Sequence, residues 1–217
     1  MNDLIQNGTL WEATQETLYM VGLSTLFTVL GGIPLGVVLA LSDRGGFATR
    51  LLGRLLGTIV NIGRSLPFII LMIAIIPFTR AVVGTSIGPE AAVVPLAVGA
   101  IPFFARLVEA AVRGVDPGLV EAATAMGART HHVVLKVLLP EALPGLIRGL
   151  TVTVVALVGY SAMAGVIGGG GLGDLAVRYG YQRFETDVMI VTVVLLIILV
   201  HLIQMLGDAT AKRLDRR

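Results

Sequence analysis

The sequence predicts an all-α membrane protein with five transmembrane helices. Of its 217 residues, 55% are hydrophobic and 14% are charged, whereas a soluble domain carries roughly 25% charged residues. The apolar residues form long uncharged runs, and a spanning helix needs about 20 such residues. The chain has no cysteine, which excludes disulfide bonds and thiolate metal sites. A net charge of +2 gives no reason to expect a nucleic-acid partner.

The first two predicted spans flank a short basic stretch. We expect residues 1–16 to form an extracytoplasmic segment that is retained, because they lack the positive start of a signal peptide. The first span is predicted over 18–41, where Pro34 and several glycines favour a kinked and closely packed helix. The basic stretch that follows has the apolar spacing of an interfacial helix. A second span is predicted over 58–79, with Arg64 reaching toward an interface.

The other three spans lie around one polar segment and one glycine-rich segment. The third span is predicted over 89–112, where Arg106 and Glu109 stand three residues apart and can pair on one helix face. The fourth is predicted over 146–168 and the fifth over 188–207. A dense run of glycines predicts that the fourth helix unwinds or ends there. These glycines are Gly165, Gly168, Gly169, Gly170, Gly171 and Gly173.

Residues 113–145, called the polar island below, separate the third and fourth spans. A helix can begin after Asp116, a good capping residue, and end at Gly127, which can take the left-handed conformation. A second short helix is predicted over about 130–138, limited by Pro140. Two short helices joined at a glycine form a segment that another protein can grip. An ordinary loop that happens to be helical is the alternative interpretation.

Basic residues predict the orientation of the chain, because cytoplasmic segments are enriched in them. With an extracytoplasmic N-terminus, the cytoplasmic segments hold Arg44, Arg50, Arg54, Arg113, Arg129, Lys136, Arg148, Lys212, Arg213, Arg216 and Arg217. The outer segments hold only Arg80, Arg178 and Arg183. The polar island and a basic tail over 208–217 are therefore expected in the cytoplasm, at the inner side of a multi-pass protein surrounded by membrane lipid.

No motif in the sequence predicts an enzyme. There is no GxxxxGK[ST] phosphate-binding loop, and the glycine-rich run lacks a following lysine. His131 and His132 have no carboxylate at ligand spacing, which favours a solvated helix face over a metal site. His201 in the last span is more typical of packing than of a proton relay. We expect no catalytic, cofactor-binding or metal-binding residues in this chain.

The polar island resembles the signature of one protein family. The EAA-x3-G-x9-I-x-LP motif of permease subunits in binding-protein-dependent ABC importers is matched throughout in spacing, with Val137 in place of the usual Ile. The matching residues are Glu121, Ala122, Ala123, Gly127, Val137, Leu139 and Pro140. Nearly the whole chain is similar to methionine importer permeases, notably over Asn61–Arg80, Val83–Gly88, Lys136–Leu146 and Leu157–Met163. The element Arg64-Ser65-x-Pro67 also resembles one found in polar amino-acid permeases.

The resemblance implies a type I ABC importer permease fold over residues 17–207, located in the bacterial cytoplasmic (inner) membrane. It implies a permease homodimer, two copies of a separate ABC ATPase that binds ATP and Mg, and an extracytoplasmic substrate-binding lipoprotein. The implied substrate is methionine, as the L and/or D isomer, moved by alternating access. The residues implied to couple the ATPase to transport are Glu121, Ala122, Ala123, Gly127, Leu139 and Pro140.

The family's translocation path would be lined by the third and fourth spans. Tyr160, Ser161 and Met163 lie just before the glycine-rich break and are candidates for the path or its gate, and Met163 could contact a thioether. Ordinary helix packing is the alternative for these three residues. For the whole chain, the alternatives are a permease for another amino acid or small solute, or a channel or scaffold without an ATPase.

Overall fold

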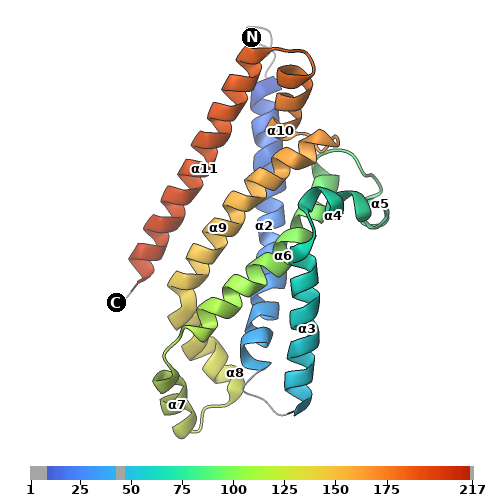
Figure 1. The fold of residues 1–217 in the computed structure, drawn as a ribbon. Coiled ribbons are helices and arrows are strands. Elements are labelled where there is room, and N and C mark those ends of the chain that lie inside the picture. Colours follow the sequence, from blue (N-terminus) through green and yellow to red (C-terminus); the bar gives the residue numbers. More distant parts are fainter. Residues whose placement is uncertain (1–8, 43–46, 216–217) are drawn as a thin grey trace.

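The structure, a computed structural model, describes residues 9–42 and 47–215, and every regular element in these ranges is a helix (Figure 1). Residues 1–8 of the expected N-terminal segment, and Arg44, Arg216 and Arg217 of the charge pattern, lie outside the described residues. The helices in chain order are α2 (Thr9–Ser42), α3 (Phe47–Ser65), α4 (Phe68–Ala74), α5 (Ile76–Val83), α6 (Pro89–Arg113), α7 (Pro117–Ala125), α8 (Thr130–Val133), the π-helix η1 (Val134–Leu138), α9 (Leu139–Val166), α10 (Gly171–Leu175), the π-helix η2 (Ala176–Tyr181) and α11 (Thr186–Leu214).

Among the described residues, four helical stretches are long and apolar enough to cross a membrane, or five if α3 and α4 form one broken span. The all-α membrane fold is thus confirmed. The expected helix bounds are too short in places: α2 begins before 18–41, and α11 continues past 188–207 into the basic tail. Hydropathy identifies only the apolar part of a helix. Polar residues with a high helix propensity continue the same helix beyond that part, so the helix is longer than the predicted span.

The span predicted over 58–79 is not one continuous helix. α3 ends at Ser65, and α4 is turned by 104° relative to it. Pro67 lies between them with an extended backbone conformation (ψ 132°). A proline has no N–H for the helix ladder and biases the preceding residue away from helical geometry. α3 is long and apolar enough to cross a membrane only together with α4, and its first half is the stretch expected at the interface.

The bundle is organised around the close pairing of α2 and α6. Gly32 and Gly36 of α2 face Phe104, Ala105 and Val108 of α6. A Cβ atom at Gly36 would lie 2.5 Å from the Ala105 carbonyl oxygen, so only glycine permits this approach. α9 packs against both helices and α11 packs mainly on α9, leaving much of α11 exposed on the outside of the bundle (Figure 1).

At one end of the bundle, the glycine-rich segment folds back against α2. α9 ends at Val166, and Gly168, Gly170 and Gly171 all have positive φ, which confirms that the helix stops there. The backbone N–H of Gly171 donates to Glu16 Oε2 at 2.7 Å, and that of Leu172 donates to Thr17 Oγ1 at 2.9 Å. Two side chains of the first helix thus fix the turn that follows the fourth span.

Candidate functional site

The polar island contains the two helical segments expected from its sequence. Asp116 Oδ1 accepts a hydrogen bond of 2.8 Å from the Gly118 N–H and caps α7. Gly127 has a φ of 82°, with bonds from Gly127 N to Thr124 O and from Ala128 N to Ala123 O. This pair of bonds is the Schellman ending of a helix, which satisfies the last carbonyl groups and favours glycine at this position.

Pro140 does not end the second segment, contrary to the sequence prediction. α8, η1 and α9 follow one another without a break, giving a helical stretch from Thr130 to Val166. Pro140 stands in the first turn of α9, directly after the π-helical turn. The wider π turn already departs from the regular hydrogen-bond ladder, so the missing proline N–H costs little there. Leu139 and Pro140 therefore join the island to the fourth span.

The residues of the EAA motif divide between an outer and an inner face. Glu121, Ala122 and Gly127 are exposed, whereas Ala123 is buried. Ala123 belongs to one apolar cluster with Val133 and Leu138 of the island and with Val108 and Val112 of α6; Val37 of α2 and Leu146 of α9 complete this cluster. The island is thus packed as a solid body on three long helices, which lets it pass a displacement to them.

Sequence reasoning missed an apolar tip on the island. Met126, directly before Gly127, is 83% exposed, and Leu119 and Leu135 are exposed apolar side chains of the same segment. Large exposed apolar side chains beside polar ones mark interaction surfaces. The signal that could have found Met126 is a long apolar side chain placed in a helix-ending turn, where no core can cover it.

A charge network ties α6 to α3. Glu109 is 6% exposed and accepts from Arg106 at 2.6 Å and from Arg113 at 2.8 Å. Arg106 also reaches across to α3, where it donates to the Gly57 carbonyl oxygen at 3.0 Å and to Asn61 Oδ1 at 2.9 Å. The expected pairing of Arg106 with Glu109 is confirmed, while the contribution of Arg113 was not foreseen.

The three candidate gate residues on α9 differ in burial and in their contacts. Tyr160 is half-buried and stacks on Phe68 of α4, with ring centroids 4.5 Å apart. Met163 is 46% exposed on the outer side of the helix. Ser161 is 2% exposed, and its hydroxyl donates to the Val158 carbonyl of its own helix at 2.8 Å. Ser161 thus faces the interior of the subunit, away from Met163.

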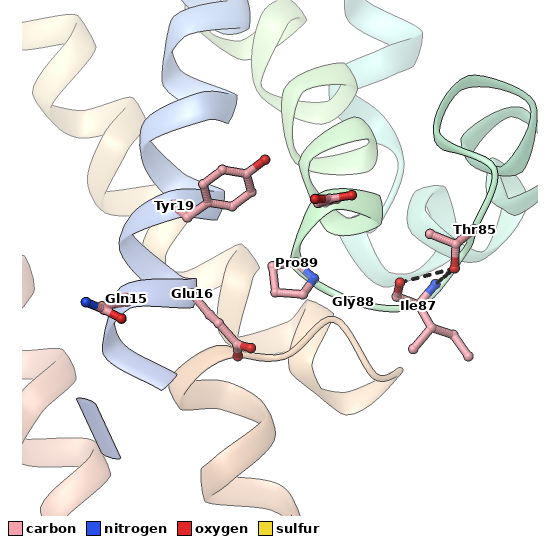
Figure 2. A pocket seen from close by; sticks show the side chains of 8 residues that line it. Gln15, Glu16, Tyr19, Thr85, Ile87, Gly88 and Pro89 are labelled. Carbon is pink, nitrogen blue, oxygen red and sulfur yellow. Dashed lines mark hydrogen bonds between the residues drawn. The ribbon is translucent and has the colours of Figure 1, made fainter. Parts of the chain in front are cut away.

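The end of the bundle that lies away from the polar island holds an open recess of about 410 Å³ (Figure 2). It lies between the start of α2, with Gln15, Glu16 and Tyr19, and the segment from Thr85 to Glu90. Nearby, Arg178 forms an ion pair with the buried Asp174, and this hydrogen bond raises the pKa of the Arg178 guanidinium above its ordinary value. Arg178 is therefore engaged within its own chain.

A bundle of helices of spanning length that carries a packed, partly exposed polar island defines the class of an integral membrane protein. The sequence model described as the binding-protein-dependent transport system inner membrane component matches residues 32–217. The chain belongs to this family.

Two relatives are similar over nearly the full length of the chain. A protein of Vibrio cholerae, named a probable D-methionine transport system permease protein MetI, is 55% identical over 94% of this chain and 92% of its own. The methionine import system permease protein MetP of Bacillus subtilis is 47% identical over 96% of this chain and 94% of its own.

Two solved structures are similar to this chain in fold. A chain from the inward-facing MetNI methionine ABC transporter superposes with a TM-score of 0.92, at 50% identity, over 95% of this chain and 96% of that chain. A chain of an amino acid ABC transporter with histidines superposes with a TM-score of 0.77 at 19% identity, over 97% of both chains. The second comparison concerns the fold alone.

Proposed function

We propose that this chain is the permease subunit of an ATP-binding cassette importer that moves methionine, as the L and/or D isomer, across the bacterial cytoplasmic membrane. The observation that carries this proposal is the 55% identity, over 94% of the chain, with a relative named for D-methionine transport. The close superposition with a chain of a methionine ABC transporter supports it independently.

In this proposal the chain works as a homodimer with two copies of an ABC ATPase and an extracytoplasmic substrate-binding lipoprotein. ATP and Mg are held by the ATPase, and this chain supplies the path. The charge asymmetry of the sequence supports an N-terminus outside and a C-terminus in the cytoplasm. The recess between Glu16 and Glu90 then lies on the extracytoplasmic side, where it can receive the binding protein.

The polar island is the part that receives motion from the ATPase. Glu121, Ala122 and Gly127 offer a polar, low-relief surface, and Met126 beside them offers an apolar anchor. Ala123 on the inner face connects this surface to α6 through the shared apolar cluster. Because packed helices move as units rather than deforming, closure of the ATPase dimer shifts the spans as well as the island.

The gate is formed by Tyr160 and Met163 on the fourth span. Met163 lies on an exposed stripe of α9 with Val152, Gly159 and Val166. No atom comes within 4 Å of the position that a Cβ at Gly159 would occupy, so this stripe can accept a second subunit closely. Ser161 takes no part in this surface because it is buried within its own subunit.

Uptake of labelled methionine tests the proposal directly. The chain is expressed with its ATPase and binding protein in a bacterial strain that lacks its own methionine importers. We expect ATP-dependent accumulation of methionine that unlabelled methionine suppresses. Accumulation that is suppressed by a different amino acid and not by methionine would redirect the substrate assignment. Purification without an ATPase, together with ion conductance, would support a channel instead.

A further inference from the structure

A small hollow lies where α3, α4, α6 and α9 meet, next to the stacked pair of Tyr160 and Phe68. Its volume is about 220 Å³, and its walls include Arg64 at the end of α3, Phe68 at the start of α4 and Phe103 of α6. Figure 1 shows that the bend between α3 and α4 lies partway along the bundle and not at its tip. The hollow thus lies partway along the bundle, beside the proposed gate.

Arg64 is a charged side chain in this recess with a vacant binding face. Its guanidinium carbon lies 5.8 Å from the centroid of the Phe103 ring, and the structure shows no carboxylate of the described residues paired with it. Arg106, by contrast, donates from both terminal guanidinium nitrogens, to Glu109, Gly57 and Asn61. Arg64 is exposed, so an anion that enters the hollow can reach its guanidinium.

The walls of the hollow match the two ends of the proposed substrate. A guanidinium presents a planar fork of N–H donors that binds a carboxylate through two parallel hydrogen bonds. Aromatic rings attract a thioether sulfur at about 5 Å. The volume of about 220 Å³ is below the range of roughly 300–1,000 Å³ typical of drug-sized ligands. It therefore suits a molecule of the size of one amino acid.

We propose that this hollow is a transit subsite for the amino acid, in which Arg64 binds the α-carboxylate and the rings of Phe68, Phe103 and Tyr160 hold the side chain. This inference rests on the proposed function and assigns a residue to substrate contact within the permease itself. No acidic residue is among the walls formed by described residues, so the α-ammonium group stays with water. Such a two-point contact holds the substrate briefly and does not select one stereoisomer.

The test uses the complete transporter, with its ATPase and binding protein, reconstituted in lipid vesicles. Methionine uptake and ATP hydrolysis are measured together. Wild-type uptake tests the proposed function, and its absence would remove both proposals. Given wild-type uptake, we expect Arg64→Gln to lower uptake per ATP hydrolysed by about tenfold or more, the equivalent of one lost hydrogen-bond pair to a charged group. Hydrolysis itself should stay near the wild-type rate.

Arg54→Gln is the matched control, because Arg54 lies on the same helix, is exposed and is not a wall of the hollow. It should keep the wild-type ratio of uptake to hydrolysis. An unchanged ratio in Arg64→Gln would overturn the subsite. A parallel loss of uptake and hydrolysis in Arg64→Gln would also overturn it, since Arg64 would then serve assembly, for example by pairing with the second subunit.

Chemical rescue separates charge from packing. The chain has no cysteine, so Arg64→Cys introduces a single thiol that methanethiosulfonate reagents can modify. We expect an aminoethyl reagent, which restores a cation, to recover part of the uptake. A neutral methyl reagent and a sulfonatoethyl reagent should not recover it. Equal recovery with the neutral reagent would overturn the role of the charge, and wild-type vesicles treated in parallel control for thiols on the partner proteins.

Discussion

Gly127 shows how one residue sets the geometry of a docking surface. Its φ of 82° closes α7 and directs the chain into α8. No atom lies within 4 Å of the position that its Cβ would occupy, so the demand for glycine comes from the backbone and not from crowding. An L-residue in this conformation costs roughly 1–2 kcal/mol, and a β-branched one is the least suited to it.

We expect Gly127→Val to uncouple ATP hydrolysis from methionine uptake, because relief of the strain would turn the island away from its docked pose. Uptake per ATP hydrolysed in reconstituted vesicles should fall several-fold. Gly114→Ala is the matched control: Gly114 has an ordinary helical φ of −76°, and its Cβ would meet only normal contacts. A wild-type ratio in Gly127→Val would contradict the role given to this turn.

Met163 is the residue whose change should open the gate. Replacing it with alanine removes a flexible apolar side chain from the exposed stripe of α9, where no neighbour of the same subunit fills the space. We expect Met163→Ala to increase the leak of methionine through the transporter in the absence of ATP. Efflux from preloaded vesicles measures this, with Val194→Ala on α11 as a control at another exposed apolar position. An unchanged leak would indicate that Met163 only packs between subunits.

At the scale of helices, the Arg106–Glu109–Arg113 network holds α3 against α6. Glu109 supplies the negative charge for two arginines, and Arg106 carries that link to Asn61 and Gly57 on α3. The network therefore fixes the angle at which α3 leaves α6.

Glu109→Gln should destabilise the protein strongly, because it leaves two arginines beside a buried position without their counter-charge. Removing one partner of a buried ion pair typically costs about 3–5 kcal/mol. Arg148→Gln, which breaks the exposed pair with Asp215, should cost about 0–1 kcal/mol. Thermal unfolding in detergent compares the two variants. Equal unfolding temperatures would show that the Glu109 pairs contribute no more than surface pairs.

The sequence predicts the long helices well and their interruptions poorly. Uncharged apolar runs locate α2, α6, α9 and α11, because a membrane imposes this pattern on any spanning helix. The hydropathy pattern does not reveal the bend at Pro67, because apolar residues continue on both sides of it. Pro140 predicts a helix end that does not occur. The π turn that accommodates this proline cannot be recognised from the amino-acid composition. Burial of Ser161 depends on contacts that the sequence does not display.

At the scale of the molecule, the polar island lies at one end of the bundle, and the proposed gate residues lie near the far end of α9 (Figure 1). The EAA spacing and Gly127 locate the island from sequence alone. Its apolar tip at Met126 emerges only from the fold, because exposure depends on how the turn is presented. The island should therefore be the part of the chain that contacts the ATPase.

A single cysteine at this tip tests that arrangement. Because the chain has no cysteine, Met126→Cys gives a unique thiol that a short thiol-to-amine cross-linker can join to a neighbouring protein. We expect a covalent product with the ATPase. Leu206→Cys, at a comparably exposed apolar position on α11, should give none. A product from position 206 but not from 126 would place the ATPase elsewhere.

The unbroken helix from Thr130 to Val166 spans 37 residues, which corresponds to about 55 Å at 1.5 Å per residue. Its first part, up to residue 145, belongs to the island, and its last turns carry Tyr160 and Met163. α6 packs against this stretch near its middle, where Ala111 faces Gly145 and Leu107 faces Gly149, so a displacement of the island can reach α6 and α9 together. In the proposed dimer, two such stretches connect the island of each subunit to its gate through continuous helical backbone.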